Sequence, residues 1–379
     1  MNDTSRRTMQ VGATDGAARA GVMVTSRTSV KTPCFMPVGT RGVVRSLATE
    51  DLEALGAPVV LANTYHLMLR PGADVVRALG GVHRFMAWDG VVITDSGGYQ
   101  VFSLAPKLDD GGVTFRSTYD GSTHRLTPEY AVDLQQRLGA DIQMVLDVCP
   151  PLPATDAVLR SAVDRTAAWA QRARLAFADN AAVEQREGWG LVQSQFGIVQ
   201  GGTDRTLRRQ SAERTVDIGF DGYAVGGLSV GESRQELLVG LEAAVELLPA
   251  DQPRYLMGVG DPASMVEAVA LGIDLFDCVL PTRHARHGTI LTSTGRLNLP
   301  GLRYATDAAP LDESCSCPVC GRYSRGYLRH LLQVGENTAR RLLTIHNVHW
   351  ILAFTESMRS AIEAGTFDQL RRRTLEVWG

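Results

Sequence analysis

The sequence lacks any long apolar stretch, and none of its hydrophobic runs reaches the length of about 18–20 residues that a membrane-spanning helix needs. Residues 1–16 (MNDTSRRTMQVGATDG) also lack the apolar core of a signal peptide. A hydrophobic content of 44% and a charged content of 21% are typical of a globular protein that buries a large core. We therefore expect a soluble protein of the cytoplasm.

Cysteine is scarce, since the chain of 379 residues contains only six. They are Cys34, Cys149, Cys278, Cys315, Cys317 and Cys320. In a large cytoplasmic protein, scattered cysteines are more often buried thiols or metal ligands than disulfides. The sequence therefore predicts no disulfide framework.

No G-x-G-x-x-G motif follows the first β-rich run. What recurs after residue 33 is an alternation of short β-rich runs with helix-like segments. The runs are 34–40, 58–67, 90–100, 141–149, 195–202, 222–230, 254–261 and 272–281. Eight such units in about 250 residues match the number and size of a TIM barrel, the (β/α)8 fold of the α/β class. A doubly wound open sheet is the alternative, which the missing glycine motif disfavours.

We expect four parts along the chain. Residues 1–33 should form short antiparallel strands that cover the barrel, and residues 34–300 should form the barrel itself. Residues 301–350 break the alternation and contain three of the cysteines, so we interpret them as an inserted subdomain. Residues 351–379 should form a C-terminal helix that packs on the barrel.

The C-terminal ends of barrel strands surround a single active-site mouth. In this chain those ends carry acids, amides and a glycine pair: Asn63, Asp95, Asp147, Gln200, Gly226, Gly227 and Asp277. Glycine-rich turns occur in ITDSGGYQVFSL and AVGGLSVGE, and such turns let backbone N–H groups approach a ligand. Each of these motifs alone is also common in ordinary loops.

The strongest local signal is the segment CSCPVC with a histidine farther along the chain. Cys315, Cys317 and Cys320 supply three soft ligands within one loop, and His346 lies on a helix-like stretch. Three thiolates and one imidazole make a tetrahedral zinc site, which is structural because no coordination position remains for water. His349 is the alternative fourth ligand, and we favour His346.

The net charge of −3 conceals an asymmetry. From Arg283 to the C-terminus the chain has thirteen Arg, no Lys and eight acidic residues, so this quarter is basic while the remainder is acidic. A basic segment on an acidic body suits an anionic partner such as nucleic acid, although solvated charge on exposed helices is the alternative. In FDCVLPTRHARHG, Asp277 ends a buried run a few residues before Arg283 and Arg286.

Taken together, these motifs closely resemble the bacterial tRNA-guanine transglycosylases over nearly the whole chain. The matching segments are NTYHL, TDSGGYQV, GIVQGG, GGLSVGE, RYLMGVG, FDCVLPTR and the C-x-C-x2-C…H pattern. The resemblance implies an enzyme that exchanges guanine in the anticodon of tRNAs for Asp, Asn, His and Tyr. The incoming base would be 7-aminomethyl-7-deazaguanine (preQ1), the queuosine precursor. It also implies one structural Zn²⁺ per subunit and a homodimer that acts on one tRNA.

The same resemblance implies the chemistry at the mouth. Asp277 matches the nucleophile that attacks C1′ of the ribose, expels guanine and forms a covalent ester. Asp95 matches the residue that handles the proton of the leaving and entering bases. Two carboxylates that act on one glycosidic carbon are the arrangement of retaining glycosyl transfer. We expect Arg283 and Arg286 to hold the phosphates that flank the ribose, because the guanidinium fork suits phosphate.

The base pocket carries over by position. Its expected residues are Asp147, Gln200, Gly226, Gly227, Leu228, Tyr99, Ser96, Met257 and Cys149. Asp147 would pair with the donor edge of guanine, while Gln200 and the Gly227 N–H would face the O6 acceptor. Tyr99 and Met257 match the residues that sandwich the ring.

The sequence departs from the family pattern in LDVCPP, where Val148 takes the place of a glutamate. The change bears on how the pocket rearranges between guanine and preQ1. Leu228 would present its carbonyl to the aminomethyl group of preQ1. Cys149 and Val230 match the bacterial enzymes and differ from the eukaryotic ones, which take the bulkier queuine. We therefore favour preQ1, with queuine as the alternative.

The sequence also bears on dimer formation and on two alternative functions. Four residues match an aromatic patch at the dimer interface of the family: Phe85, Tyr323, Tyr327 and His330. Aromatic residues at helical spacing are also common in cores. A non-catalytic tRNA-binding subunit on the same fold would have no use for Asp95, Asp147 and Asp277 together. A metal-dependent barrel hydrolase would carry His-x-His after its first strand, where this chain has PVGT.

Overall fold

The computed structural model describes residues 8–104, 106–187 and 192–379. Residues 1–7 of the expected N-terminal cover, and residues 105 and 188–191 of the expected barrel segment, lie outside the described residues. No helix in these described ranges has the length and apolar character needed to cross a membrane.

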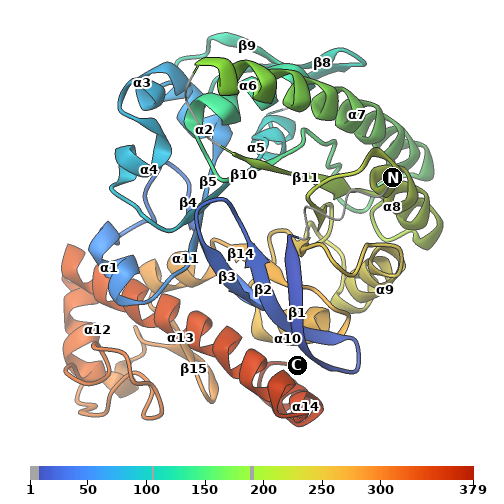
Figure 1. The fold of residues 1–379 in the computed structure, drawn as a ribbon. Helices are drawn as coiled ribbons and strands as arrows, with labels where there is room; N and C mark the ends of the chain where they lie inside the picture. Colours follow the sequence, from blue (N-terminus) through green and yellow to red (C-terminus); the bar gives the residue numbers. More distant parts are fainter. Residues whose placement is uncertain (1–7, 105, 188–191) are drawn as a thin grey trace.

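Eight parallel strands close into a barrel at the centre of the molecule (Figure 1). In chain order they are β4 (Cys34–Gly39), β5 (Val59–Ala62), β6 (Val91–Thr94), β10 (Ile142–Met144), β11 (Ser194–Val199), β12 (Gly222–Val225), β13 (Arg254–Leu256) and β14 (Leu275–Cys278). Each strand overlaps one of the eight expected runs, and the barrel closes where β14 pairs with β4, with Leu275 opposite Cys34. The predicted TIM barrel is therefore confirmed and the open sheet is wrong.

Two of the expected runs pass from strand into helix. β5 stops at Ala62 because Asn63 caps α2 (Thr64–Leu69), its side chain accepting a hydrogen bond from the His66 N–H at 3.1 Å. β6 gives way to α5 (Gly98–Phe102) after Gly97 adopts a left-handed conformation, with a φ of 77°. Among the polar residues at the mouth, Asn63, Asp95, Asp147 and Gln200 therefore lie just beyond their strands, whereas Asp277 lies within β14.

Helices surround the barrel and connect its strands (Figure 1). Besides α2 and α5 they are α1 (Thr49–Ala54), α3 (Ala73–Ala78), α4 (Gly81–Met86), α6 (Pro128–Leu138), α7 (Asp156–Glu187), α8 (Arg205–Ile218), α9 (Arg234–Val245) and α10 (Pro262–Ala270). Side-chain caps define several of their starts: Thr127, Asp204, Ser233 and Asp261 each accept a hydrogen bond from a backbone N–H of the first turn. An antiparallel sheet is inserted before α6, formed by β7 (Lys107–Asp109), β8 (Gly112–Arg116) and β9 (Thr123–Leu126).

A second antiparallel sheet lies across the barrel in Figure 1, formed by β1 (Met9–Asp15), β2 (Ala18–Val24) and β3 (Ser29–Thr32). Arg19 on β2 anchors it, because Nε and Nη2 donate to the Asp274 carboxylate at 2.8 and 2.5 Å. The same guanidinium donates to the carbonyls of Ala250 and Gln252 at 2.6 and 2.8 Å. Asp274 precedes β14 and is fully buried, so this ion pair ties the sheet to the N-terminal end of the barrel.

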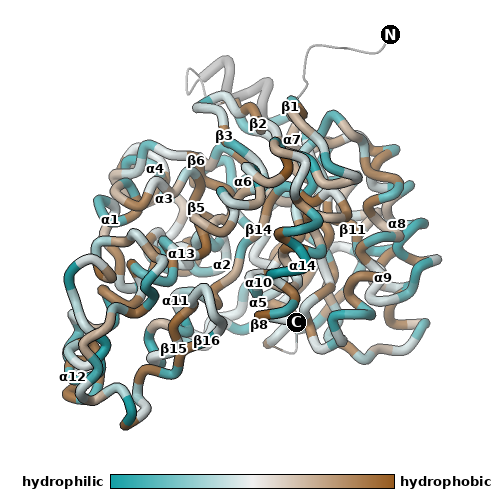
Figure 2. The backbone as a smooth tube through the Cα atoms, turned by 90° about the horizontal axis from the view of Figure 1, so that it is seen from below, coloured by the Kyte–Doolittle hydropathy of each residue, from teal (hydrophilic) through white to brown (hydrophobic). Residues whose placement is uncertain are grey.

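The chain after β14 leaves the barrel alternation. It forms α11 (Leu280–Arg286), a hairpin of β15 (Thr289–Thr292) and β16 (Gly295–Asn298), a 3-10 turn (Leu302–Tyr304), α12 (Arg325–Gln333), α13 (Asn337–Glu363) and α14 (Phe367–Trp378). Figure 2 shows α12 and the hairpin projecting away from the barrel. Helix α13 runs without a break through residue 350 and packs on α11 and β4. This single helix therefore links the cysteine-containing segment to the barrel.

The Arg19–Asp274 pair makes a specific stability prediction. Asp274→Asn leaves the buried Arg19 without its counter-charge, so we expect the free energy of unfolding to fall by about 3–5 kcal/mol. The matched control is Glu246→Gln, which breaks the exposed Arg209–Glu246 pair and should cost less than about 1 kcal/mol. Urea unfolding of both variants measures the difference, and equal losses would contradict the prediction.

Candidate functional site

A cavity of about 280 Å³ opens at the end of the barrel where the strands stop. Its lining contains ten of the eleven residues expected to bind substrate or catalyse: Asp95, Ser96, Tyr99, Asp147, Cys149, Gly226, Gly227, Leu228, Met257 and Asp277. The eleventh, Gln200, is buried directly behind this lining at 1% exposure. Barrel closure has therefore brought together residues that are spread over 183 positions of the chain, from 95 to 277.

Asp95 is held by the loop that follows the neighbouring strand β5. Its Oδ1 accepts hydrogen bonds from the backbone N–H groups of Thr64 and Gly97 at 2.9 and 3.1 Å. Its Oδ2 accepts a hydrogen bond from Asn63 Nδ2 at 2.5 Å. Burial raises the pKa of Asp95 to about 7 despite these hydrogen bonds, and the nearby charges of Asp277 and Asp147 raise it further. Asp95 can therefore exchange a proton near neutral pH.

Asp277 is the penultimate residue of β14 and lines the same cavity. Its Oδ1 accepts hydrogen bonds from the Tyr255 hydroxyl at 2.5 Å and from the Gly258 N–H at 2.8 Å. Burial raises the pKa of Asp277, and the two hydrogen bonds oppose this by stabilising the ionised form. Among the described residues none donates to Oδ2, so one oxygen is fixed and the other is available to a ligand.

Asp147 and Gln200 form a polar pair at the inner end of the cavity. Gln200 Nε2 donates to Asp147 Oδ2 at 2.6 Å. Burial raises the pKa of Asp147 to about 6, against the hydrogen bond from Gln200. Gln200 Oε1 is buried and has no hydrogen-bond partner in the described part of the chain. The pair can thus offer both donors and acceptors to a planar, hydrogen-bonding ligand.

Gly226 and Gly227 pack closely against the side chain of Gln200. A Cβ on Gly226 would lie 2.8 Å from Gln200 Nε2, and one on Gly227 would lie 2.2 Å from Gln200 Oε1. Gly227 also has a φ of +63°, which disfavours any larger residue. The absence of side chains lets a ligand approach the backbone of this wall.

The next residues of the wall are fixed by Glu232. Its carboxylate accepts hydrogen bonds from the N–H groups of Ser229 and Val230, the latter at 3.0 Å. Ser229 has a φ of 62°, an uncommon conformation for a residue with a side chain. Because N–H and C=O point in opposite directions across a trans peptide, the Leu228 carbonyl points away from Glu232. Leu228, Ser229 and Val230 line the cavity, whereas Glu232 does not.

The remaining expected residues lie around the opening. Tyr99 on α5 is 60% exposed, so its ring is available to cover a ligand. Met257 and Ser96 line the cavity, and the Ser96 hydroxyl accepts from the Gly98 N–H at 3.2 Å. Burial raises the pKa of Cys149 to about 12, so this thiol stays protonated and uncharged.

Arg283 and Arg286 lie outside the cavity, on α11 directly after Asp277. Arg283 is exposed, whereas Arg286 lines a separate groove with Arg45 and Arg340. Burial and the charges of Arg45, Arg283 and Arg340 lower the pKa of Arg286. In the described ranges none of these four arginines forms an ion pair with a carboxylate, so the surface beside the cavity carries unbalanced positive charge.

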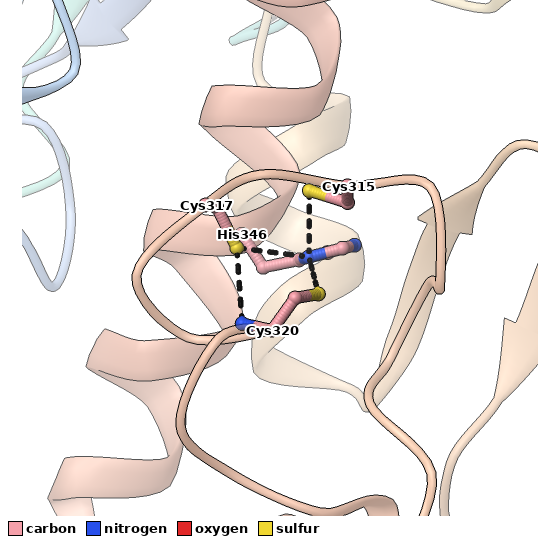
Figure 3. Close-up of side chains that lie close together, drawn as sticks. All are labelled: Cys315, Cys317, Cys320 and His346. Atoms are coloured by element: carbon pink, nitrogen blue, oxygen red, sulfur yellow. Dashed lines mark hydrogen bonds between the residues drawn. The ribbon is translucent and has the colours of Figure 1, made fainter.

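The cysteine cluster is assembled between the loop before α12 and helix α13 (Figure 3). The ligand atoms of Cys315, Cys317, Cys320 and His346 all lie within 4.8 Å of one another. His346 Nδ1 faces the three sulfurs at 3.7, 3.5 and 3.2 Å, while its Nε2 lies 2.8 Å from the Leu291 carbonyl on β15. His349 points instead at Ser316, at 3.4 Å. These four residues could hold a metal ion, with Leu291 orienting the imidazole.

Sequence reasoning missed three residues that hold the site. From the sequence, Tyr255 resembles a core residue of a buried strand. Glu232 resembles an ordinary acidic residue of a loop, and Arg208 resembles one of several arginines on a helix. Of the three, only Tyr255 could have been found from the sequence, because the hydroxyl of a buried tyrosine needs a hydrogen-bond partner. The roles of Glu232 and Arg208 depend on backbone orientation, which no residue pattern encodes.

Comparison with known proteins places the chain among close relatives. A family model described as queuine tRNA-ribosyltransferase matches residues 14–379. The queuine tRNA-ribosyltransferase of Cereibacter sphaeroides is 49% identical over 364 residues, which cover 96% of this chain and 94% of that protein. The protein of the same name from Symbiobacterium thermophilum is 49% identical over 96% of this chain and 88% of its own length. That from Syntrophobacter fumaroxidans is 50% identical, with 94% and 93% covered. The similarity thus includes both the barrel and the cysteine-containing segment.

The raised pKa of Asp95 predicts how stability depends on pH. Between about pH 4 and 7 the folded protein keeps on Asp95 a proton that an unfolded aspartate has released, so stability falls as pH rises through this range and levels off above it. The free energy of unfolding should fall from pH 5 to pH 8, and Asp95→Asn should make that fall smaller. Urea unfolding at several pH values measures the slope, with exposed Asp89→Asn as the control. An unchanged slope in Asp95→Asn would refute the assignment.

The cysteine cluster predicts a tightly held metal ion. Cys317→Ser removes a buried ligand, so we expect loss of the ion and a fall in melting temperature of more than about 5 °C. Elemental analysis and thermal unfolding measure both effects. Ser316→Ala, an exposed change within the same loop, is the control. A metal-free wild-type protein that melts at the same temperature as the loaded form would be the contrary outcome.

Proposed function

The chain belongs to the queuine tRNA-ribosyltransferase family of tRNA-guanine transglycosylases, whose substrate is tRNA, and from this we propose its reaction and the residues responsible. The reaction replaces guanine at the anticodon wobble position of tRNAs for Asp, Asn, His and Tyr with preQ1, through a covalent glycosyl-enzyme intermediate. The observation that carries this proposal is the convergence of Asp95, Asp147 and Asp277 on one cavity. A tRNA substrate also suggests that the reaction takes place in the cytoplasm.

Asp277 is the proposed nucleophile. Tyr255 and Gly258 bind Oδ1 and leave Oδ2 to attack C1′ of the ribose as the bond from C1′ to N9 of guanine breaks. Asp95, protonated in part at neutral pH, donates a proton to the departing base. It then accepts the N9 proton of preQ1, whose nitrogen attacks C1′ and displaces Asp277. Two inversions restore the original configuration.

Base recognition is assigned to the inner end of the cavity. Ionised Asp147 accepts hydrogen bonds from N1–H and the 2-amino group of the base, since both are donors in guanine and in preQ1. Gln200 and the Gly227 N–H then serve the O6 acceptor. Adenine reverses this pattern of donors and acceptors, so it would leave buried polar groups unpaired. Tyr99 and Met257 hold the two faces of the ring.

The choice of preQ1 rests on the Leu228 carbonyl. Glu232 holds the Ser229 and Val230 N–H groups, an arrangement that favours a carbonyl directed at the cavity. An aminomethyl group is a cationic donor that such an acceptor would bind, whereas guanine has no donor at the equivalent position. Val148 is buried and adds no polar side chain to this wall. Queuine, which carries a bulkier substituent on the same nitrogen, is the alternative substrate.

Arg283 and Arg286 are the proposed phosphate contacts. Both follow the nucleophile on α11, and Arg286 also faces the groove that contains Arg45 and Arg340. RNA bound with its ribose at Asp277 would pass over unbalanced positive charge. Such contacts position the RNA and make its affinity depend on salt.

The metal is proposed to be one structural zinc ion per subunit, in the subdomain of residues 301–350. Three thiolates and one imidazole fit tetrahedral Zn²⁺, and Cys315, Cys317, Cys320 and His346 leave no position for substrate. When bound, zinc would supply cross-linking of the loop to α13 and no catalytic group.

A homodimer is proposed through the aromatic residues beside the metal cluster. Tyr323 and Tyr327 stack with ring centroids 5.6 Å apart, and Tyr327 is 46% exposed. Exposed Tyr327 on α12, stacked on the half-buried Tyr323 just before that helix, is suited to burial against a second subunit, with Phe85 and His330 as neighbours in the interface.

One exchange assay tests the proposed function. Incorporation of radiolabelled guanine into tRNA should be blocked by preQ1 at lower concentration than by queuine. Stronger competition by queuine would reverse the substrate assignment. Failure of the protein to incorporate guanine into any tRNA would instead favour a non-catalytic tRNA-binding role.

Asp277→Asn tests the nucleophile. An amide oxygen attacks C1′ poorly, so we expect exchange to fall by at least about 1,000-fold. The tRNA adduct that survives denaturation should also disappear from gels. Asp89→Asn, an exposed carboxylate outside the cavity, should retain both. An adduct in the Asp277→Asn protein would mean that another residue bonds to the ribose.

A further inference from the structure

Arg208 is a fully buried cation directly behind the base pocket. It lies on α8 and has an exposure of 0%. No carboxylate in the described ranges lies within ion-pair distance of its guanidinium. A buried charge without a counter-ion is strongly unfavourable unless its donors are all well bound. Retaining an arginine here therefore calls for a role that a neutral core residue could not perform.

The guanidinium is bound entirely by backbone carbonyls. Nε donates to Gly202 at 2.7 Å, and Nη1 donates to Val199 at 2.9 Å. Nη1 also donates to Gly226 at 2.7 Å, and Nη2 donates to Gly227 at 3.0 Å. The first two acceptors flank Gln200 at the end of β11 and just after it, and the other two form the glycine wall after β12. One side chain thus joins the two loops that read the base.

The direction of these hydrogen bonds determines what faces the cavity. The Gly226 carbonyl and the Gly227 N–H belong to one planar trans peptide, so they point in opposite directions. Since Arg208 takes the carbonyl on the buried side, the Gly227 N–H is turned toward the cavity that these glycines line. A cationic donor on the carbonyl also polarises the peptide and strengthens its N–H as a donor. Glycine has wide backbone freedom, so without this contact the peptide could rotate.

We propose that Arg208 is a positioning residue that makes the pocket specific for bases with a 6-oxo group, by orienting and polarising the Gly227 N–H. This inference rests on the proposed function, because it assumes that a guanine-like base occupies the cavity. It goes beyond that function in assigning the discrimination at O6 to a residue that touches no part of the substrate. If Arg208 only stabilised the fold, its substitution would weaken the binding of all bases equally. The test therefore compares bases with and without the 6-oxo group.

The experiment compares two bases in wild type, Arg208→Lys and a control. Guanine carries the 6-oxo group, and 2-aminopurine keeps the 2-amino group but lacks that oxygen and the proton on N1, so each variant is compared with wild type on the same base. Lysine preserves the charge yet cannot bind both loops with a fork. Arg209→Lys is the control, since its neighbour Arg209 is exposed and paired with Glu246. Binding is measured by calorimetry without tRNA, and kcat and KM by guanine exchange.

We expect Arg208→Lys to weaken guanine binding about tenfold and 2-aminopurine binding less than about twofold, which corresponds to one lost or weakened hydrogen bond. KM for guanine should rise in parallel while kcat changes little, and Arg209→Lys should match wild type. Equal weakening of both bases, or unchanged guanine binding, would overturn the proposal. If wild type neither binds nor exchanges guanine, the proposed function fails. If wild type is active but Arg208→Lys leaves the ratio of guanine to 2-aminopurine affinity unchanged, only the role of Arg208 fails.

A second measurement holds even if Arg208→Lys does not fold. Wild-type crystals soaked with guanine should place O6 about 2.7–3.2 Å from the Gly227 nitrogen, with Arg208 still bound to the Gly226 carbonyl. A bound guanine whose O6 accepts no hydrogen bond from Gly227, or a Gly226 carbonyl released from Arg208, would overturn the proposal without any variant.

Discussion

Burial of three carboxylates at one end of a closed parallel barrel is the constraint on which the chemistry depends. Each aspartate loses solvation there, and burial raises the pKa of Asp95 to about 7, that of Asp147 to about 6 and that of Asp277 above its usual range. The surrounding hydrogen bonds then give the aspartates different environments. Asp95 can carry a proton near neutral pH, while Asp277 is held at one oxygen by Tyr255 and Gly258. The fold thus gives one residue type two environments that suit the two chemical roles proposed for it.

The two ends of the barrel differ: one carries a buried ion pair that stabilises the fold, and the other carries the cavity. At the N-terminal end the buried Arg19–Asp274 pair fixes the β1–β3 sheet to the barrel. Both oxygens of the Asp274 carboxylate accept hydrogen bonds from protein groups there. At the other end, residues in and just beyond the strands leave acceptors such as Gln200 Oε1 and Asp277 Oδ2 for a ligand. This separation is usual for TIM barrels, because side chains fill the barrel interior and only the loops can vary freely.

The cysteine cluster is connected to the cavity end of the barrel through helix α13. His346 on α13 faces the three cysteines, and its neighbour Asn347 donates to the Pro281 carbonyl at the start of α11 at 3.0 Å. Asn347 also accepts from the Leu291 N–H at 3.0 Å. Because α11 begins three residues after Asp277 and carries Arg286, an ion that orders α13 would also order the proposed RNA contacts. A structural metal can in this way affect substrate binding without approaching the base.

Much of the molecule was readable from the sequence. The alternation of β-rich runs and helices predicted the barrel, and the acids at the run ends predicted Asp95, Asp147 and Asp277 at one mouth. Local spacing likewise predicted the cysteine cluster. Only the tertiary structure shows where β5 and β6 end. It alone also shows the hydrogen bond from the Ser229 N–H to Glu232 and the contacts of Arg208 with four carbonyls. Side-chain periodicity records which residues are buried, whereas the direction of a peptide N–H depends on contacts between segments far apart in the chain.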